Sequence, residues 1–256
     1  MNRYECGATI DIGPNRESQE DFVQFKELDD DSILCLIADG SGSRSEYPKP
    51  APIVCMNIIE QIYRLYNADQ ELFMQNPCLL LKESFLQANK LIGAFKIASE
   101  ELFYGYASSV TALLLTKGQR FFVAHCGSTR LWVLREGDLR QLTTDHTKAM
   151  ELLREGVIDK DTYHVHPDRL VLTSGLGVFA EPEIQTLKGK FRQNDMFILT
   201  SDGVHYAIRP EYISKIILDS TASCEAATYN LIMAARDVSK YPDNMSAMIV
   251  IEKNQG

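Results

Sequence analysis

Two hydrophobic periods alternate along the chain. Apolar runs of strand length, separated by polar turns, predict strands at residues 21–25, 32–39, 109–116, 120–126, 130–136, 195–203 and 243–252. The run at 32–39 is almost uninterrupted, which is typical of a strand that is buried on both faces. Polar stretches at residues 116–118 and 135–139 suit tight turns, so hairpins are expected there.

Helical spacing separates groups of these strands. Apolar residues recur every three or four positions at Val54, Ile58, Ile62 and Leu65, and again at Leu81, Phe85, Ala88, Ile92 and Phe95. Further helices are expected near residues 210–218 and 222–238, and a short helix with a surface excursion is expected at 147–168. Clustered hairpins and paired helices favour an α+β fold with antiparallel sheet over alternating βαβ units.

Length and composition narrow the classes of protein to consider. The 256 residues carry a net charge of -9 and a hydrophobic content of 45%, and we expect one domain over residues 1–256. The acidic balance argues against nucleic acid as a partner. The sequence has neither a secretory leader nor an apolar run of about 18 residues, so no membrane span is expected. Six scattered cysteines without a Cys-x-x-Cys pair indicate reduced thiols in the cytoplasm and argue against a cysteine zinc site.

Carboxylates stand at matching ends of four predicted strands. Asp39 and Asp202 each follow an apolar run and precede a glycine, whereas Glu20 and Asp243 stand where two other strands begin. Because the end of one antiparallel strand lies beside the start of its neighbour, these four side chains are expected to converge at one sheet edge. Each Asp-Gly pair alone is more typical of a turn, so the hypothesis depends on the recurrence.

Four converging carboxylates would need a counter-ion. Ionised like charges a few ångströms apart raise each other's pKa or bind a cation. Oxygen ligands select Mg²⁺, Mn²⁺ or Ca²⁺, and the glycines after Asp39 and Asp202 would let the backbone turn tightly, so that a main-chain carbonyl could join them. Two such ions are the usual means of hydrolysing phosphate esters. Arg16, four residues before Glu20, suits a phosphate oxyanion, although a lone arginine is more often a solvated surface residue.

These residues, in this order, resemble the metal-dependent protein phosphatases (PPM), the type 2C Ser/Thr phosphatases, in their bacterial single-domain form. The resemblance spans nearly the whole chain, through the segments GPNRESQED, ADGSGS, GYASSVTALLL, AHCGSTRLWVLREGDLRQLTTDHT, LTSGLG, FILTSDGV and DNMSAMIVI. It implies a four-layer αββα sandwich, in which two antiparallel sheets are flanked by helix pairs.

The resemblance also implies a site. Two Mg²⁺ or Mn²⁺ ions would be bound by Glu20, Asp39, Gly40, Asp202 and Asp243, with Asp39 between both ions. Arg16 would hold the substrate phosphate, and a metal-bridging hydroxide would attack phosphorus. Asp21 and Asn244 would orient the ligands or their waters. The polar segment 147–168 corresponds to the mobile flap that borders the site in bacterial members.

The sequence departs from the family pattern at three positions. Ser128 stands where the family has an aspartate that binds a third, weaker ion, and a neutral hydroxyl is a poor ligand, which leaves a third ion in question. Ser43 replaces the second glycine of the Asp-Gly-x-Gly-Gly loop, and Gln19 replaces an asparagine.

The leading hypothesis is a cytoplasmic phosphatase that hydrolyses phosphoserine and phosphothreonine in signalling proteins. Its expected partners are phosphoproteins and a Ser/Thr protein kinase, with no nucleic acid and no membrane, and a monomer is expected. Ser128 and Ser43 motivate a rival hypothesis, a pseudophosphatase that uses the same fold for binding or regulation. A calcium-stabilised structural domain is a third.

Overall fold

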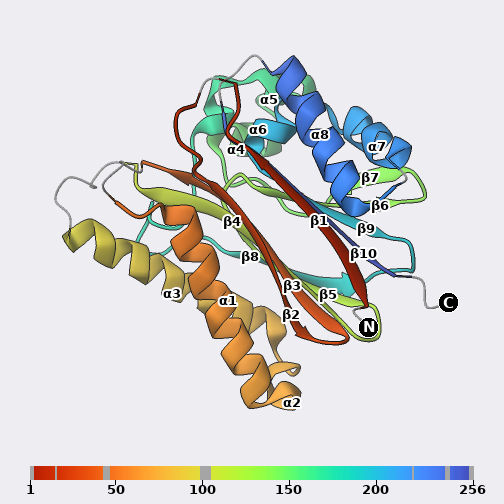
Figure 1. Cartoon of the computed structure of the whole chain (residues 1–256). Helices are drawn as coiled ribbons and strands as arrows, with labels where there is room; N and C mark the ends of the chain where they lie inside the picture. Colours follow the sequence, from red (N-terminus) through yellow and green to blue (C-terminus); the bar gives the residue numbers. More distant parts are fainter. Residues whose placement is uncertain are drawn as a thin grey trace.

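Two stacked antiparallel sheets form the centre of the molecule in a computed structural model (Figure 1). The structure describes residues 3–14, 16–42, 47–98, 105–220, 222–239 and 243–253. One five-stranded sheet contains, in spatial order, β1 (Tyr4–Asp11), β10 (Met245–Glu252), β9 (Met196–Thr200), β6 (Arg130–Arg135) and β7 (Asp138–Gln141). The other contains β2 (Asp21–Asp29), β3 (Ser32–Ser41), β4 (Ala107–Thr116), β5 (Arg120–Cys126) and β8 (Gln185–Lys190).

Helices cover the outer face of each sheet. Residues 50–98 form α1 (Pro50–Ala68), α2 (Gln70–Phe73) and α3 (Pro77–Ala98), of which α1 packs on β2 to β4 and α3 on β5 and β8. On the other sheet, α8 (Cys224–Val238) packs on β1 and β10, and α7 (Pro210–Asp219) packs on α8 and β7. This arrangement confirms the predicted α+β fold as a four-layer αββα sandwich (Figure 1).

Successive side chains of β3 point alternately to two buried faces, which explains why its sequence is apolar at almost every position. Leu34, Leu36 and Ala38 point into the core beneath α1 and α3, whereas Ile33 and Ile37 point into the core between the two sheets. A central strand between a helix layer and a second sheet has no solvated face, so an uninterrupted apolar run is what this position requires. The same strand ends at the edge of the sandwich, where Asp39 is half-buried.

Short helices lie at one end of the sandwich. They are α4 (Lys148–Arg154), α5 (Lys160–Val165), the 3₁₀ helix η2 (Pro167–Leu170) and α6 (Asp202–His205). The first three occupy the segment for which one short helix was predicted. Asp202 begins α6 directly after β9, so the predicted strand at 195–203 is longer than the observed one.

Of the short edge strand β7, only the preceding turn was predicted, and two further edge strands, β1 and β8, were not predicted at all. Each has a weak apolar pattern: β8 exposes every second residue, and β1 carries glycine and alanine at two of its positions. Both owe their extended form to pairing with a strand distant in sequence, β1 with β10 and β8 with β5. Such pairing is a tertiary effect that local propensity does not contain.

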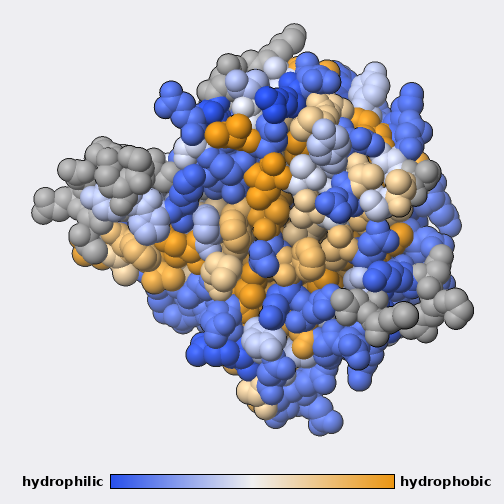
Figure 2. All heavy atoms as spheres, in the orientation of Figure 1, coloured by the Kyte–Doolittle hydropathy of each residue, from blue (hydrophilic) through white to orange (hydrophobic). Residues whose placement is uncertain are grey.

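The sheets meet along β1 and β2. In the face shown by Figure 2, residues coloured as hydrophobic form a band down the middle. The two strands contact each other.

No helix among the described residues has the length and apolar character needed to cross a bilayer.

Candidate metal centre

An acidic cavity opens at the end of the sandwich where the short helices lie. Its volume is about 320 Å³. Among its lining residues are Arg16, Glu20, Asp39, Gly40, Ser128, Asp202, Asp243 and Asn244. The structure therefore brings together around one space all the predicted site residues except Asp21, which lies directly behind them.

Antiparallel geometry accounts for this convergence. Asp21, the first residue of β2, is the register partner of Asp39 near the end of β3. On the other sheet, β10 begins just after Asp243 and pairs with β9, which ends just before Asp202. Starts and ends of neighbouring strands thus meet at one edge of each sheet, and the stacking of the sheets brings the two edges together.

The carboxyl groups are close enough to perturb one another. The carboxyl groups of Asp39 and Asp202 lie close enough for each to affect the ionisation of the other. Burial, with added repulsion from Asp202, Asp21 and Asp243, raises the pKa of Asp39 well above its usual range. Burial and the charges of Asp243 and Asp21 raise the pKa of Asp202 to about 7. Without a cation, at least one of these groups must hold a proton to relieve the repulsion.

Asp21 is buried behind the cavity. Burial raises its pKa to about 6, against the lowering effect of hydrogen bonds from hydroxyl groups. The hydroxyl of Ser246 donates one of these bonds to Oδ2 at 2.7 Å. Asp21 is therefore tied to β10 and adds negative charge behind Asp39 and Asp202.

Asn244 connects the loop before β2 to the start of β10. Its Oδ1 accepts a hydrogen bond from the backbone N–H of Glu20 at 2.8 Å. Its Nδ2 donates to the carbonyl oxygens of Ile12 and Ser18 at 2.8 and 3.0 Å. This buried amide thereby holds the backbone of Glu20 beside Asp243.

Two glycines allow the backbone to approach closely at this site. A Cβ at Gly203 would lie 2.1 Å from the carbonyl oxygen of Asn244, and one at Gly40 would lie 2.8 Å from that of Glu20. Both distances are far inside van der Waals contact, so any side chain would push the acidic loops apart. The glycine after each aspartate is thus required by packing as well as by turning.

Arg16 pairs with one of the carboxylates. Its Nη2 lies 2.8 Å from Oδ1 of Asp243, and both side chains are partly exposed. Within the described residues, no three His, Cys, Asp or Glu side chains are already arranged as ligands of one ion. The donors are all oxygens, which fit a hard divalent cation.

Ser128 occupies a neutral corner of the cavity. Its hydroxyl lies 3.1 Å from that of Ser109, which also accepts a hydrogen bond from the backbone N–H of Ser128. The two serines satisfy each other and bring no charge. Ser43, the other departure that was noted in the sequence, lies outside the described residues.

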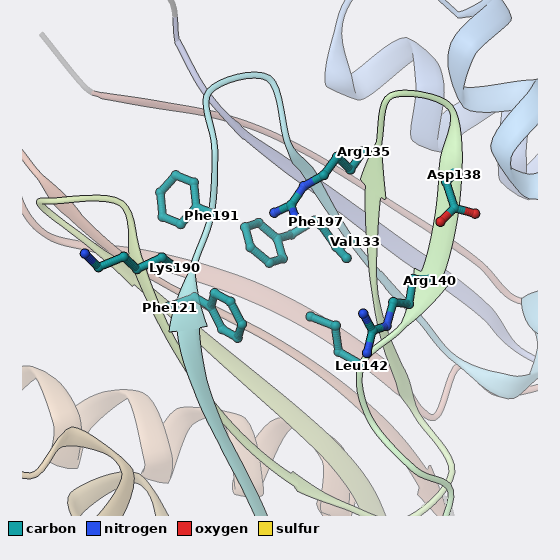
Figure 3. Close-up of a pocket in the computed structure, with 9 residues that line it drawn as sticks. All are labelled: Phe121, Val133, Arg135, Asp138, Arg140, Leu142, Lys190, Phe191 and Phe197. Carbon is teal, nitrogen blue, oxygen red and sulfur yellow. The ribbon is translucent and has the colours of Figure 1, made fainter.

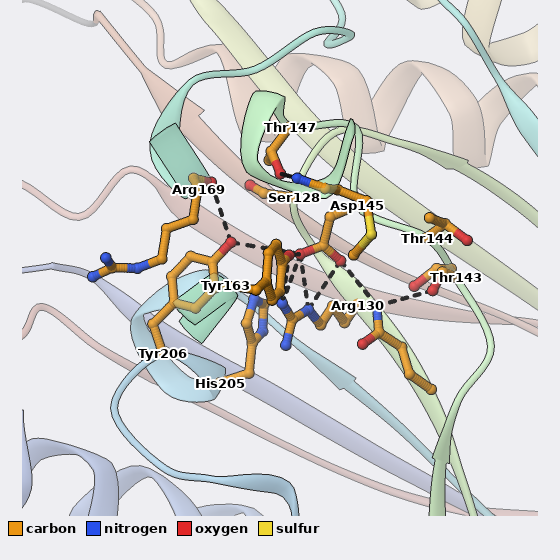
Figure 4. Close-up of polar contacts among 12 residues, drawn as sticks. Ser128, Arg130, Thr143, Thr144, Asp145, Thr147, Tyr163, Arg169, His205 and Tyr206 are labelled. Carbon is orange, nitrogen blue, oxygen red and sulfur yellow. Dashed lines mark hydrogen bonds and ion pairs between the residues drawn. The ribbon is translucent and has the colours of Figure 1, made fainter. Parts of the chain in front are cut away.

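A buried ion pair lies beside the cavity (Figure 4). Arg130 Nε is 2.9 Å from Asp145 Oδ1, and Nη2 is 2.6 Å from Oδ2. The hydroxyl of Tyr163 on α5 donates to Asp145 Oδ2 at 2.5 Å, and that of Tyr206, after α6, donates to the carbonyl of Arg169 at 3.2 Å. The charge of Arg130 lowers the pKa of Asp145 to about 2 despite burial.

Sequence reasoning missed this ion pair. The available signal was an arginine within the apolar run 130–134, because a charged residue is rarely buried without a partner. The segment that contributes Tyr163 also brings Leu170 and Leu172 to the wall of the acidic cavity. Nearby, His146 accepts a hydrogen bond at Nδ1 from the backbone N–H of Gly127 at 3.2 Å.

Both a family model and individual known proteins match most of this chain. A family model described as Protein phosphatase 2C matches residues 14–237. The chain is 28% identical over 244 residues to the serine/threonine phosphatase stp of Listeria welshimeri, with 95% of this chain and 94% of that protein covered.

Solved structures share the fold. The crystal structure of the Mycobacterium tuberculosis serine/threonine phosphatase PstP/Ppp is similar with a TM-score of 0.82 and 25% identity, over 98% of this chain and 99% of that one. A structure described as the catalytic domain of PstP in complex with two manganese ions has a TM-score of 0.79 and 23% identity, over 98% and 99% of the two chains.

Proposed function

The chain belongs to the protein phosphatase 2C family, and from this premise we propose that its acidic cavity hydrolyses phosphoserine and phosphothreonine in proteins. The family assigns the chain to the metal-dependent phosphoprotein phosphatases. We further propose which residues bind the ions and which bind the phosphate.

The oxygen donors divide into two groups that share Asp39. Glu20, Asp39 and the carbonyl of Gly40 would hold one Mg²⁺ or Mn²⁺ ion. Asp39, Asp202 and Asp243 would hold the second. Two bound divalent ions would supply a nucleophile at neutral pH and Lewis acidity at the phosphate. The manganese-bound PstP structure supports a pair of ions at this kind of site.

The other residues bind and orient. Arg16 reaches the cavity from the loop before β2, and its planar guanidinium can hold two phosphate oxygens. Because Arg16 contacts Asp243, it is already placed next to the proposed second ion. Asn244 fixes the backbone at Glu20, and Asp21 lies behind Asp39. Both contacts limit the motion of the proposed ligands.

One observation carries the proposal. Four carboxylates from four separate strand ends, and one arginine, line a single cavity, and the charge of Asp202 perturbs the ionisation of Asp39. Such crowding is unfavourable unless a cation is bound. A purely structural domain or a pseudophosphatase has no physical need for it.

Turnover of a phosphothreonine peptide with Mn²⁺ tests the proposal. We expect hydrolysis that requires the ion, and a loss of roughly 10³-fold or more in kcat/KM for Asp39→Asn, because ion-derived stabilisation amounts to several kcal/mol. Asp30→Asn, an equal charge change at an exposed turn, is the matched control and should keep full activity. Calorimetry with Mn²⁺ on both variants gives a second readout.

Two results would contradict the proposal. Equal turnover by Asp39→Asn and the unchanged protein would remove Asp39 from the mechanism. Absence of Mn²⁺ binding at millimolar concentration would favour the pseudophosphatase, and calcium-dependent stability without turnover would favour the structural domain.

Further parts of the proposal concern context. We propose that residues 1–256 act as one catalytic domain, as a monomer, on proteins phosphorylated by a Ser/Thr kinase. The six free cysteines support a reducing compartment such as the cytoplasm.

A further inference from the structure

We propose that a second cavity, at the opposite end of the sandwich, binds a small organic anion with a flat apolar body. Its volume is about 330 Å³, within the range of small-ligand sites. It lies where the edge strands β7 and β8 approach each other (Figure 3). Its lining residues are Phe121, Val133, Arg135, Asp138, Arg140, Leu142, Lys190, Phe191 and Phe197.

This cavity is separate from the acidic one. No described residue lines both. Phe121 stands at the start of β5, and Ser128 of the acidic cavity follows the end of the same strand. At the rise of an extended chain the two positions are about 23 Å apart. A ligand in the second cavity would therefore not compete directly with a phosphate in the first.

Three phenylalanines form one side of the cavity (Figure 3). The ring centroids of Phe121 and Phe197 are 5.5 Å apart, and those of Phe191 and Phe197 are 5.7 Å apart. Phe191 and Phe197 are buried, so the rings are fixed by packing. Such a surface favours a flat apolar group, which can pack against a ring face or edge without loss of hydration.

Two arginines face the phenylalanines. In Figure 3 the guanidinium groups of Arg135 and Arg140 extend toward the space between them and the rings, whereas the carboxylate of Asp138 and the amine of Lys190 point away. Arg135 is held by Asp195, with Nε–Oδ1 at 2.8 Å and Nη2–Oδ2 at 2.6 Å. That ion pair leaves Nη1 of Arg135 unused by Asp195.

Arg140 supplies the uncompensated charge. In the described part of the chain its side chain has neither an ion pair nor a hydrogen bond, and it is exposed on the edge strand β7. Arg135, by contrast, also has a purely structural use, since Asp195 accepts from the backbone N–H of Arg192 in the turn before β9. One uncompensated guanidinium beside an aromatic surface matches a singly charged carboxylate or sulfonate on an aromatic body.

Binding of 2-naphthalenesulfonate, followed by fluorescence and NMR on the Mn²⁺-loaded protein, tests the assignment. We expect saturable binding that excess inorganic phosphate does not displace. Arg140→Gln should weaken binding about tenfold, the effect of losing one charge-assisted hydrogen bond. Val133→Phe should abolish binding by filling the cavity. Arg120→Gln is the matched control, because Arg120 is exposed beside Phe121 but does not line the cavity.

Four outcomes would overturn the proposal. Binding that phosphate displaces would place the sulfonate in the acidic cavity. Equal binding of the neutral 2-naphthalenemethanol, or equal weakening by Arg120→Gln, would remove the role of Arg140. Tighter binding of an acidic peptide with an aromatic side chain would make the cavity a protein-docking site. Thermal unfolding and phosphatase activity of each variant, both expected to be unchanged, exclude misfolding as the cause.

Discussion

At the residue scale, the acidic cavity depends on where single side chains stand relative to a strand end. Asp39 follows a strand with no solvated face, so its position is held by the packed body of β3. Ser128 stands at an equally well-held position after β5, yet its hydroxyl only pairs with that of Ser109. The difference between Asp39, a proposed ligand, and Ser128 is therefore chemical and not positional.

A carboxylate introduced at position 128 tests whether charge, and not position, separates Ser128 from Asp39. Ser128→Asp adds a negative charge to the wall of the cavity, and we expect the number of Mn²⁺ ions bound, measured by calorimetry, to rise by one. Ser128→Asn, which has the same shape without the charge, should leave the number unchanged. An unaltered number in Ser128→Asp would mean that geometry, and not the missing charge, limits binding at this corner.

At the element scale, the Arg130–Asp145 ion pair joins β6 to the segment that carries α5 and η2. Both side chains are almost fully buried, and Tyr163 from α5 donates to the same carboxylate. The α5 helix has only six residues, too few to be stable alone. Its position beside the acidic cavity therefore depends on such long-range contacts.

Removal of one charge should destabilise this region strongly. Asp145→Asn leaves Arg130 buried without a counter-ion, and we expect a loss of about 3–5 kcal/mol in the free energy of unfolding. Tyr163→Phe removes one hydrogen bond and should cost about 1 kcal/mol. Urea unfolding at pH 7 measures both. Similar values for the two variants would show that the ion pair contributes no more than its hydrogen bonds.

The same ion pair has a pH signature. Because the folded-state pKa of Asp145 is lowered to about 2, against about 3.9 in the unfolded chain, its contribution is fully present above about pH 4 and declines as the pH falls toward 2. The difference in unfolding free energy between the unchanged protein and Asp145→Asn should therefore shrink over that interval.

At the scale of the whole molecule, the sandwich has a cavity at each of two opposite ends. The acidic end gathers negative charge that costs free energy in the absence of a cation. The other end combines aromatic rings with guanidinium groups. Each end uses both sheets, so neither cavity would exist in one sheet alone.

Stability should accordingly depend on divalent ions. An ion that binds only the folded state adds about 2.7 kcal/mol at a concentration 100 times its Kd, so Mn²⁺ should raise Tm by roughly 5–10 °C for a chain of this size. Asp202→Asn should lose most of this rise, because a ligand is gone and a carboxylate repulsion is relieved. Thermal unfolding with EDTA and with Mn²⁺ measures both; an equal rise in the variant would exclude Asp202 as a ligand.

The sequence by itself determined the features that are local or that follow from strand geometry. Apolar period identified β3, β4, β5 and the long helices, because burial on one or two faces imposes that period. Antiparallel order then brought Glu20, Asp39, Asp202 and Asp243 to one edge. The resemblance to the family supplied the remaining assignments, such as those of Asp21 and Asn244, and supported that of Arg16.

Only the tertiary structure decided what depends on distant contacts. The strands β1 and β8 form because β10 and β5 offer free edges, not because of their own weak patterns. Arg16 pairs with Asp243, and Arg130 with Asp145, across long stretches of chain. The second cavity lies between β7 and β8, which belong to different sheets. Their relation is set by the packing of the two sheets, which no local period in the sequence records.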